Sequence, residues 1–385
     1  MSTDDFFNFA TFESMKKIPN SKWQRHPEDV LPMWLANPDF KIAPEIKEAL
    51  IRAVEAEDLY YNSDVPAREA MVDKIKRVNG VEAQIDNVMI TQGVDSAIWL
   101  VVKNISNAGD EVVLSNPMYG PFHNVLRNLN MKPVHWMLDF DEGYRFDKER
   151  LKEAVTPQTK LICLCNPHNP TGRVMDRQEL QAVADIAVDH DITVFVDELW
   201  EDIRFDGKKH VSLASMGPEI ADKTVTAWGV SKTFGVAGLF IGYLYAENKE
   251  LSQGIRREAR TIQRGCSTIA RAAAPVMLDE TLDWWRRDMM VHLHKIRDIC
   301  LDRLNQIPGV TFPRIEGTYV PFPKFNIDMT SDELNSYLLK KAKVGLASGS
   351  GYGSNGEGHQ RICIATSETL INEAIDRIEN ALNKL

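Results

Sequence analysis

The chain has 385 residues, of which 44 % are hydrophobic and 26 % charged, a composition typical of a globular protein with a large core and two domains. The net charge of -10 argues against broad attraction to nucleic acid or to an anionic membrane. Five cysteines are scattered without metal spacing, so no metal site is expected. The N-terminus lacks a basic region ahead of an apolar run, and no apolar stretch approaches about 18 residues. We therefore expect a cytoplasmic protein whose partners include neither nucleic acid nor a membrane.

The first 45 residues are rich in proline and irregular, and the first predicted helix covers residues 44–54, with a proline in its first turn. From residue 87 onwards, short apolar runs alternate with segments of helical periodicity, such as residues 177–189. This alternation predicts an α/β fold with a mostly parallel sheet covered by helices. The predicted strands are residues 88–91, 111–115, 161–165, 193–196 and 224–228.

A smaller α+β domain is predicted from the N-terminal arm and the C-terminal part. Beyond residue 247 the chain becomes helical, and beyond Pro308-Gly309 four short apolar runs, starting at Val310, Tyr319, Lys324 and Arg361, suggest a small sheet. Helices over about residues 331–343 and 369–384 are expected to cover this sheet. The predicted domains are residues 46–287 for the large one, and residues 1–45 with 288–385 for the small one.

Polar or glycine-rich sequences follow five of the predicted strands. Open parallel sheets bind ligands along the edge where their strands end, so these sequences are predicted to line one crevice. They are Gly93-Val94-Asp95, Asn116-Pro-Met-Tyr119, Asn166-Pro-His-Asn169-Pro-Thr-Gly172, Asp197-Glu-Leu-Trp200 and Ser231-Lys232.

Lys232 stands at a bend of small residues between two apolar strands. Burial there favours the neutral amine, which is the nucleophilic form of lysine. An isolated Ser-Lys pair is usually an ordinary loop element, so the prediction depends on the other strand-end motifs.

Those motifs contain the groups that pyridoxal phosphate chemistry needs. A lysine forms an imine with the cofactor, and an acid keeps the pyridine nitrogen protonated. Asp197 ends an apolar strand, where an unpaired carboxylate is costly, although it is also compatible with a helix N-cap. Asn169 lies between two prolines and can donate to the ring's phenolate oxygen, or it can serve a turn. Tyr119 can stack on the ring, and Gly93, ahead of a helix, can present backbone amides to a phosphate.

In the order and spacing of these motifs, nearly the whole chain resembles the fold-type I, class I/II aminotransferase superfamily of pyridoxal phosphate enzymes. The resemblance implies that Lys232 is the Schiff-base lysine and that Asp197 pairs with the pyridine nitrogen. It implies that Asn169 contacts the phenolate oxygen and that Tyr119 stacks on the ring. Arg361, in Gln-Arg-Ile-Cys-Ile, matches the arginine that binds the substrate's alpha-carboxylate.

The resemblance also implies how the phosphate is bound. The segment Gly93, Val94 and Asp95 and the hydroxyl of Ser231 are expected beside it. Tyr60 or Tyr61 matches a tyrosine that reaches a neighbouring subunit's phosphate, which predicts a homodimer with shared active sites. Two departures weaken this phosphate site. Phe240 stands in place of an arginine, and Gly229 in place of a serine.

Within the superfamily, the N-terminal motifs and Glu316-Gly-Thr-Tyr319 resemble most the carbon-sulfur beta-lyase branch of the MalY/PatB type. Ala36 and Asn37 are the expected substrate contacts in the N-terminal arm. Asn37-Pro38, however, replaces the Asp-Met of the lyase branch. Trp200 replaces the tyrosine of aminotransferases or the histidine of the lyases, and its indole N–H can donate to the phenolate oxygen but cannot exchange a proton.

Three functions follow. The favoured one is an aminotransferase, in which Lys232 removes the alpha proton of an amino acid in the external aldimine and returns it to the cofactor, giving a keto acid. The alternative is a beta-lyase that releases pyruvate, ammonia and a thiol from cystathionine or cysteine conjugates. The third is a regulator that retains the fold without catalysis. A dicarboxylate substrate would need a second cation, for which Arg264 is a candidate.

Overall fold

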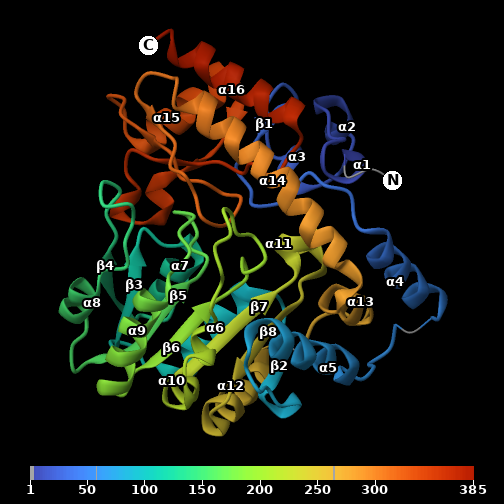
Figure 1. The fold of residues 1–385 in the computed structure, drawn as a ribbon, viewed down its shortest axis with the longest axis vertical. Helices are drawn as coiled ribbons and strands as arrows, with labels where there is room; N and C mark the ends of the chain where they lie inside the picture. The colour runs from blue at the N-terminus through green and yellow to red at the C-terminus, as the bar shows by residue number, and fades with distance from the viewer. Residues whose placement is uncertain (1–3, 58, 263–264) are drawn as a thin grey trace.

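A computed structural model describes residues 4–57, 59–262 and 265–385 as an α/β structure built on one seven-stranded sheet (Figure 1). The strand order is β2-β8-β7-β6-β5-β3-β4, with β8 (Gly242–Ala246) antiparallel to both of its neighbours. The remaining strands are mutually parallel, which confirms the predicted fold class. They are β2 (Val88–Thr91), β3 (Glu111–Asn116), β4 (Lys132–Met137), β5 (Thr159–Cys165), β6 (Thr193–Asp197) and β7 (Thr224–Gly229).

Burial explains which strands could be recognised in the sequence. Every residue of β2, β3 and β8 is buried, and strands covered on both faces consist of nearly continuous apolar residues. β4 is different because it forms the edge of the sheet, where Trp136 is its one buried residue. Its exposed Lys132 and His135 interrupt the apolar pattern, and this strand was therefore not predicted.

Helices flank the sheet along its length (Figure 1). The predicted helix over residues 177–189 is α9 (Arg177–Asp189), and the one over 44–54 is α4 (Pro44–Glu55). The others in this part of the chain are α5 (Val65–Lys74), α6 (Val94–Ile105), α7 (Gly120–Asn128), α8 (Lys148–Ala154), α10 (Pro218–Lys223), α11 (Ser231–Phe234), α12 (Lys249–Ile262) and α13 (Thr268–Leu278).

The N-terminal arm and the C-terminal part of the chain share the upper region of Figure 1. There the strands form three separate pairs rather than the one small sheet that was predicted, and the run at Tyr319 is buried without being a strand. The helices are α1 (Asp4–Phe7), α2 (Phe12–Lys16), α3 (Ser21–Gln24), α14 (Asp283–Leu304), α15 (Ser331–Tyr337) and α16 (Glu368–Leu382). The pairs are β1 (Leu31–Pro32) with β11 (Val344–Gly345), β9 (Val310–Thr311) with β10 (Lys324–Phe325), and β12 (Ala347–Ser348) with β13 (Gln360–Arg361).

The β1-β11 pair joins the N-terminal arm to the C-terminal part of the chain. The boundary proposed between residues 287 and 288 falls inside α14, which continues through it because residues such as Trp285 and Met289 are buried on both sides of that point. In the part of the chain that the structure describes, none of the helices combines the length and the apolar character needed to cross a membrane.

Candidate active site

A cavity of about 200 Å³ opens at the carboxyl edge of the parallel strands. It collects residues that follow β2, β3, β5, β6 and β7, together with others from the N-terminal arm and from β13. The lining residues are Leu35, Ala36, Gln92, Gly93, Val94, Asp95, Tyr119, Asn169, Asp197, Leu199, Trp200, Ser231, Lys232, Ala237, Phe240, Ile241 and Arg361. The strand ends that were predicted to share a crevice are therefore brought together.

Lys232 lies in α11, the short helix that follows β7. Its Nζ donates a hydrogen bond to the backbone carbonyl of Ala36 at 2.9 Å. Burial lowers the pKa of Lys232, and the positive charge of Arg361 lowers it further, while the carboxylates of Asp95 and Asp197 act in the opposite direction. The amine is thus poised to lose its proton more readily than an exposed lysine.

The N-terminal arm places the Ala36 carbonyl through a buried ion pair. Lys22 Nζ donates to Asp39 Oδ2 at 2.8 Å and to the backbone carbonyl of Asn37 at 2.9 Å. Lys22 and Asp39 are both 1 % exposed. The segment from Ala36 to Asp39 is consequently fixed against the cavity, and the backbone of Ala36 rather than its methyl group contacts the lysine.

Asp197 is the last residue of β6 and is 2 % exposed. Its Oδ1 accepts a hydrogen bond from the backbone N–H of Leu199 at 3.0 Å, and its Oδ2 lies 4.0 Å from the sulfur of Cys165. Burial raises the pKa of Asp197 to about 7, with Asp95 adding to the effect. Neither contact brings a cation, so a protonated nitrogen at this carboxylate would relieve the cost of its burial.

Arg361 belongs to β13 and is 5 % exposed. Its Nη1 donates to Asn169 Oδ1 at 3.3 Å and its Nη2 to the backbone carbonyl of Trp34 at 3.0 Å. Among the described residues its Nε is buried without a hydrogen-bond partner. The ring of Tyr352 lies 5.2 Å from the guanidinium carbon. The two hydrogen bonds leave N–H groups of the guanidinium that a bound carboxylate could use.

Gly93 precedes α6 with a φ of 80°, a conformation that favours glycine. The first backbone N–H groups of α6 have no partner within the helix, and the positive end of the helix dipole lies at Val94 and Asp95. Burial raises the pKa of Asp95, while Lys232 and the Tyr119 side chain oppose the rise. This wall of the cavity therefore offers an anion site beside the Asp95 carboxylate.

Phe240 and Gly229 stand where the resemblance implies an arginine and a serine. Lys232 and Arg361 are the cations among the described residues that line the cavity. Phe240 reaches its rim with a φ of 48° and is 66 % exposed. A side chain at Gly229 would place its Cβ 2.7 Å from Cδ1 of Leu199. Leu199 thus occupies the space that a serine at position 229 would need.

Some predicted contacts lie elsewhere. Tyr60 and Tyr61 are 81 % and 93 % exposed and do not line the cavity of their own chain. Asn37 is half-buried and is absent from the lining, although Ala36 belongs to it. Arg264 lies outside the described residues.

Five lining residues were not singled out in the sequence. Leu35 and Leu199 flank predicted residues, and this adjacency was the available signal. Gln92, Ala237 and Ile241 offered none, because neither a lone glutamine nor small and apolar residues in a loop indicate a site.

The donor set fits pyridoxal phosphate. A buried amine, a buried carboxylate whose hydrogen-bond contacts among the described residues include no cation, an amide, an aromatic side chain and the N-terminus of a helix surround one cavity. The fold and this set of residues define a class of lysine-containing α/β proteins able to bind an aromatic aldehyde that carries an anionic group.

Comparison with known proteins identifies the family. Residues 29–378 match the family model described as aminotransferase class I and II, and the chain belongs to that family. It is 30 % identical over 361 residues to an aspartate aminotransferase of Pyrococcus horikoshii, covering 92 % of this chain and 91 % of that protein. It is 28 % identical over 390 residues to the cystathionine beta-lyase PatB of Bacillus subtilis, covering 98 % and 100 %. A solved putative aminotransferase from Clostridium difficile, bound to PLP, superposes with a TM-score of 0.92 at 29 % identity, covering 98 % of this chain and 99 % of that one.

Proposed function

We propose that this chain is a pyridoxal phosphate-dependent aminotransferase that converts an amino acid to a 2-keto acid. The observation that carries the proposal is that Lys232, Asp197, Asn169, Tyr119 and Arg361 line one cavity. The family match and the PLP in the Clostridium difficile neighbour support the cofactor. Its partners are then an amino acid and a keto acid.

The cofactor, when bound, draws electrons from the alpha carbon of the substrate. Asp197 supports this chemistry because a carboxylate with so high a pKa needs a cation, which the pyridine nitrogen provides when protonated. Asn169 presents its side-chain amide from the end of β5, and the ring of Tyr119 forms another part of the wall. These three side chains would hold the ring of the cofactor in the cavity.

Lys232 acts as the base and then as the acid. Burial favours its neutral amine, which can accept the alpha proton, and the same Nζ can return the proton at a neighbouring carbon. Its hydrogen bond to Ala36 keeps the amine at one side of the cavity. Ser231 and the N-terminus of α6 are the groups assigned to the phosphate.

Arg361 binds the alpha-carboxylate of the substrate. A guanidinium presents parallel N–H groups that match a carboxylate, and Arg361 lines the cavity with N–H groups that Asn169 and Trp34 do not use. Its bonds to Asn169 and Trp34 hold the guanidinium in place before the substrate arrives.

The phosphate site is completed by a second subunit in this proposal. Tyr60 and Tyr61 are exposed at the surface, where they are free to reach the cavity of a neighbouring copy. A hydroxyl supplied in this way would compensate for the missing cation at Phe240. The homodimer with shared active sites is therefore part of the proposed function.

A beta-lyase is the second candidate. The match to PatB extends over 98 % of this chain and all of that protein, whereas the match to the Pyrococcus horikoshii aminotransferase covers 92 %. The same five cavity residues would serve beta-elimination, because it starts from the same removal of the alpha proton. Trp200 and Asn37-Pro38 favour transamination.

A spectrally monitored screen of amino acids, each with and without 2-keto acids, tests the proposal. An aminotransferase changes the cofactor's absorbance with the amino acid alone and turns over repeatedly only when a keto acid is present. Pyruvate released from cystathionine without any keto acid would replace the proposal by the lyase. A purified protein that shows no imine absorbance after reconstitution would contradict both.

A further inference from the structure

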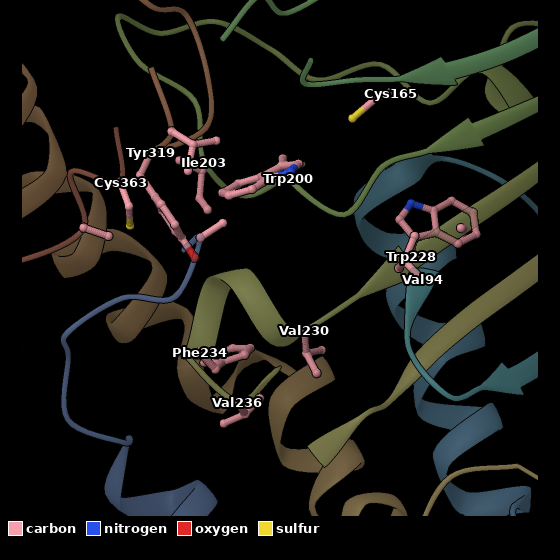
Figure 2. Packing of buried hydrophobic residues seen from close by; sticks show 14 of the residues in the cluster. Val94, Cys165, Trp200, Ile203, Trp228, Val230, Phe234, Val236, Tyr319 and Cys363 are labelled. Carbon is pink, nitrogen blue, oxygen red and sulfur yellow. The ribbon is translucent and has the colours of Figure 1, made fainter. Parts of the chain in front are cut away.

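Trp200, Lys232 and Tyr319 contact one another, each residue touching the other two. Trp200 is 1 % exposed, yet its ring is part of the cavity wall. The Nζ of Lys232 lies over this ring, 5.6 Å from its centre. Tyr319 meets Trp200 edge to face, with ring centres 4.7 Å apart, and Figure 2 shows the two rings next to each other. The Tyr319 hydroxyl donates a hydrogen bond to the backbone carbonyl of Lys232 at 3.2 Å, so Tyr319 contacts both of the other residues.

Both neighbours of the amine favour its protonated form. The face of an indole attracts an ammonium group within about 6 Å, and tryptophan does so more strongly than the other aromatic residues. The second neighbour, the carbonyl of Ala36 at 2.9 Å, is a hydrogen-bond acceptor. An ammonium group therefore makes a charge-assisted hydrogen bond and a contact with the ring, whereas a neutral amine keeps only a weaker hydrogen bond and loses the attraction to the ring.

Charged and titratable groups face the same amine from several elements. Arg361 on β13 disfavours the ammonium, whereas Asp95 on α6, Asp197 on β6 and Cys363 favour it. Trp200 differs from all of them because it carries no charge and does not titrate. Its contribution stays constant when substrate or cofactor changes the protonation of its neighbours.

We propose that the face of Trp200 and the carbonyl of Ala36 together hold the ammonium form of Lys232. In this position Lys232 would retain the proton that it has taken from the substrate until the proton is returned. This inference rests on the proposed function, in which Lys232 carries that proton. Trp200 is then a positioning residue for Lys232. Its ring face carries this role, in addition to any hydrogen bond from its indole N–H.

The test measures the protonation of Lys232 in the cofactor-free protein. The rate of imine formation with pyridoxal, which lacks the phosphate, is followed by absorbance across pH 6 to 10, and its midpoint reports the loss of the lysine proton. We expect Trp200→Leu to lower this midpoint by about one pH unit, the equivalent of a desolvated cation-π contact. Trp200→Phe, which keeps a weaker aromatic face, should lower it by less.

Trp136→Phe is the matched control. Trp136 is fully buried in β4, and its indole N–H donates to the carbonyl of Asp147 rather than facing the cavity. This control should leave the midpoint unchanged. An unchanged or raised midpoint in both Trp200 variants would overturn the inference, and if Trp200→Leu does not fold, Trp200→Phe decides it. Failure of the wild-type protein to form an imine at any pH would instead overturn the proposed function.

Discussion

Arg361 donates a hydrogen bond from Nη1 to Oδ1 of Asn169 across 3.3 Å, and this bond joins two segments 192 residues apart. In the proposed function Arg361 binds the substrate and Asn169 contacts the cofactor. The bond therefore couples the two binding subsites, and it holds the guanidinium in the orientation that a carboxylate requires.

Replacing Arg361 by lysine should weaken substrate binding without removing the positive charge. A lysine cannot present parallel N–H groups to a carboxylate. We expect kcat/KM to fall by about 10- to 100-fold, the equivalent of a charge-assisted hydrogen bond of about 1.5–3 kcal/mol. Steady-state kinetics measure the effect, with the exposed Arg287→Lys as the control. Equal kcat/KM for Arg361→Lys and the wild type would remove Arg361 from the substrate site.

Lys232→Ala should separate an enzyme from a regulator. The variant lacks the amine that forms the imine, so its absorbance after addition of pyridoxal phosphate should match that of the free cofactor, and transamination should be lost. Lys209→Ala, on the loop before Ser212, controls for the loss of a lysine elsewhere. A biological effect that survives Lys232→Ala in cells would favour the non-catalytic regulator.

The pH dependence of stability should report on Asp197. Burial raises the pKa of this carboxyl to about 7, above its value of about 3.9 in an unfolded chain. Between these values the folded protein binds the proton and the unfolded chain does not, so stability falls as pH rises from 4 to 7. Without cofactor, the Tm should decline over this range, and Asp197→Asn should reduce the decline. The exposed Asp328→Asn is the control, and an identical decline in wild type and Asp197→Asn would contradict the assignment.

The sequence identified the strand-end motifs because each breaks a buried apolar pattern. Lys232 and Asp197 stood out for this reason, and their shared edge followed from the parallel topology. Contacts between residues that are distant in the chain leave no such pattern in the sequence. The Ala36 carbonyl that accepts from Lys232 is a backbone atom, and its position depends on the ion pair of Lys22 with Asp39. The sequence also could not show that the side chain of Leu199 fills the space beside Gly229, because the two residues are 30 positions apart and meet only in the fold.

The close approach of Leu199 to Gly229 predicts that a substitution at Leu199 offsets the loss of stability caused by a side chain at position 229. Gly229→Ser should place its Cβ 2.7 Å from Leu199 Cδ1, and because this methyl group ends a flexible side chain that can shift, we expect a loss of about 1 kcal/mol of unfolding free energy, the lower end of the range for overpacking. Leu199→Ala removes the obstructing methyl groups, so the double variant should be more stable than the sum of the two single changes predicts. Urea unfolding of the four proteins measures the coupling. Strict additivity would show that the two positions do not compete for space.

The buried ion pair between Lys74 and Glu201 should be a major determinant of stability. Both side chains are less than one-tenth exposed, and Asn79 Nδ2 donates to Glu201 Oε2 at 2.6 Å. Lys74→Ala leaves the Glu201 carboxylate buried with its cation removed, which costs about 3–5 kcal/mol for a pair of this kind. Lys152→Ala is the matched control, since its pair with Glu149 lies at the surface and exposed pairs contribute about 0–1 kcal/mol. Urea unfolding should therefore show a large loss for Lys74→Ala and a small one for Lys152→Ala. Similar losses in the two variants would mean that solvent reaches Glu201.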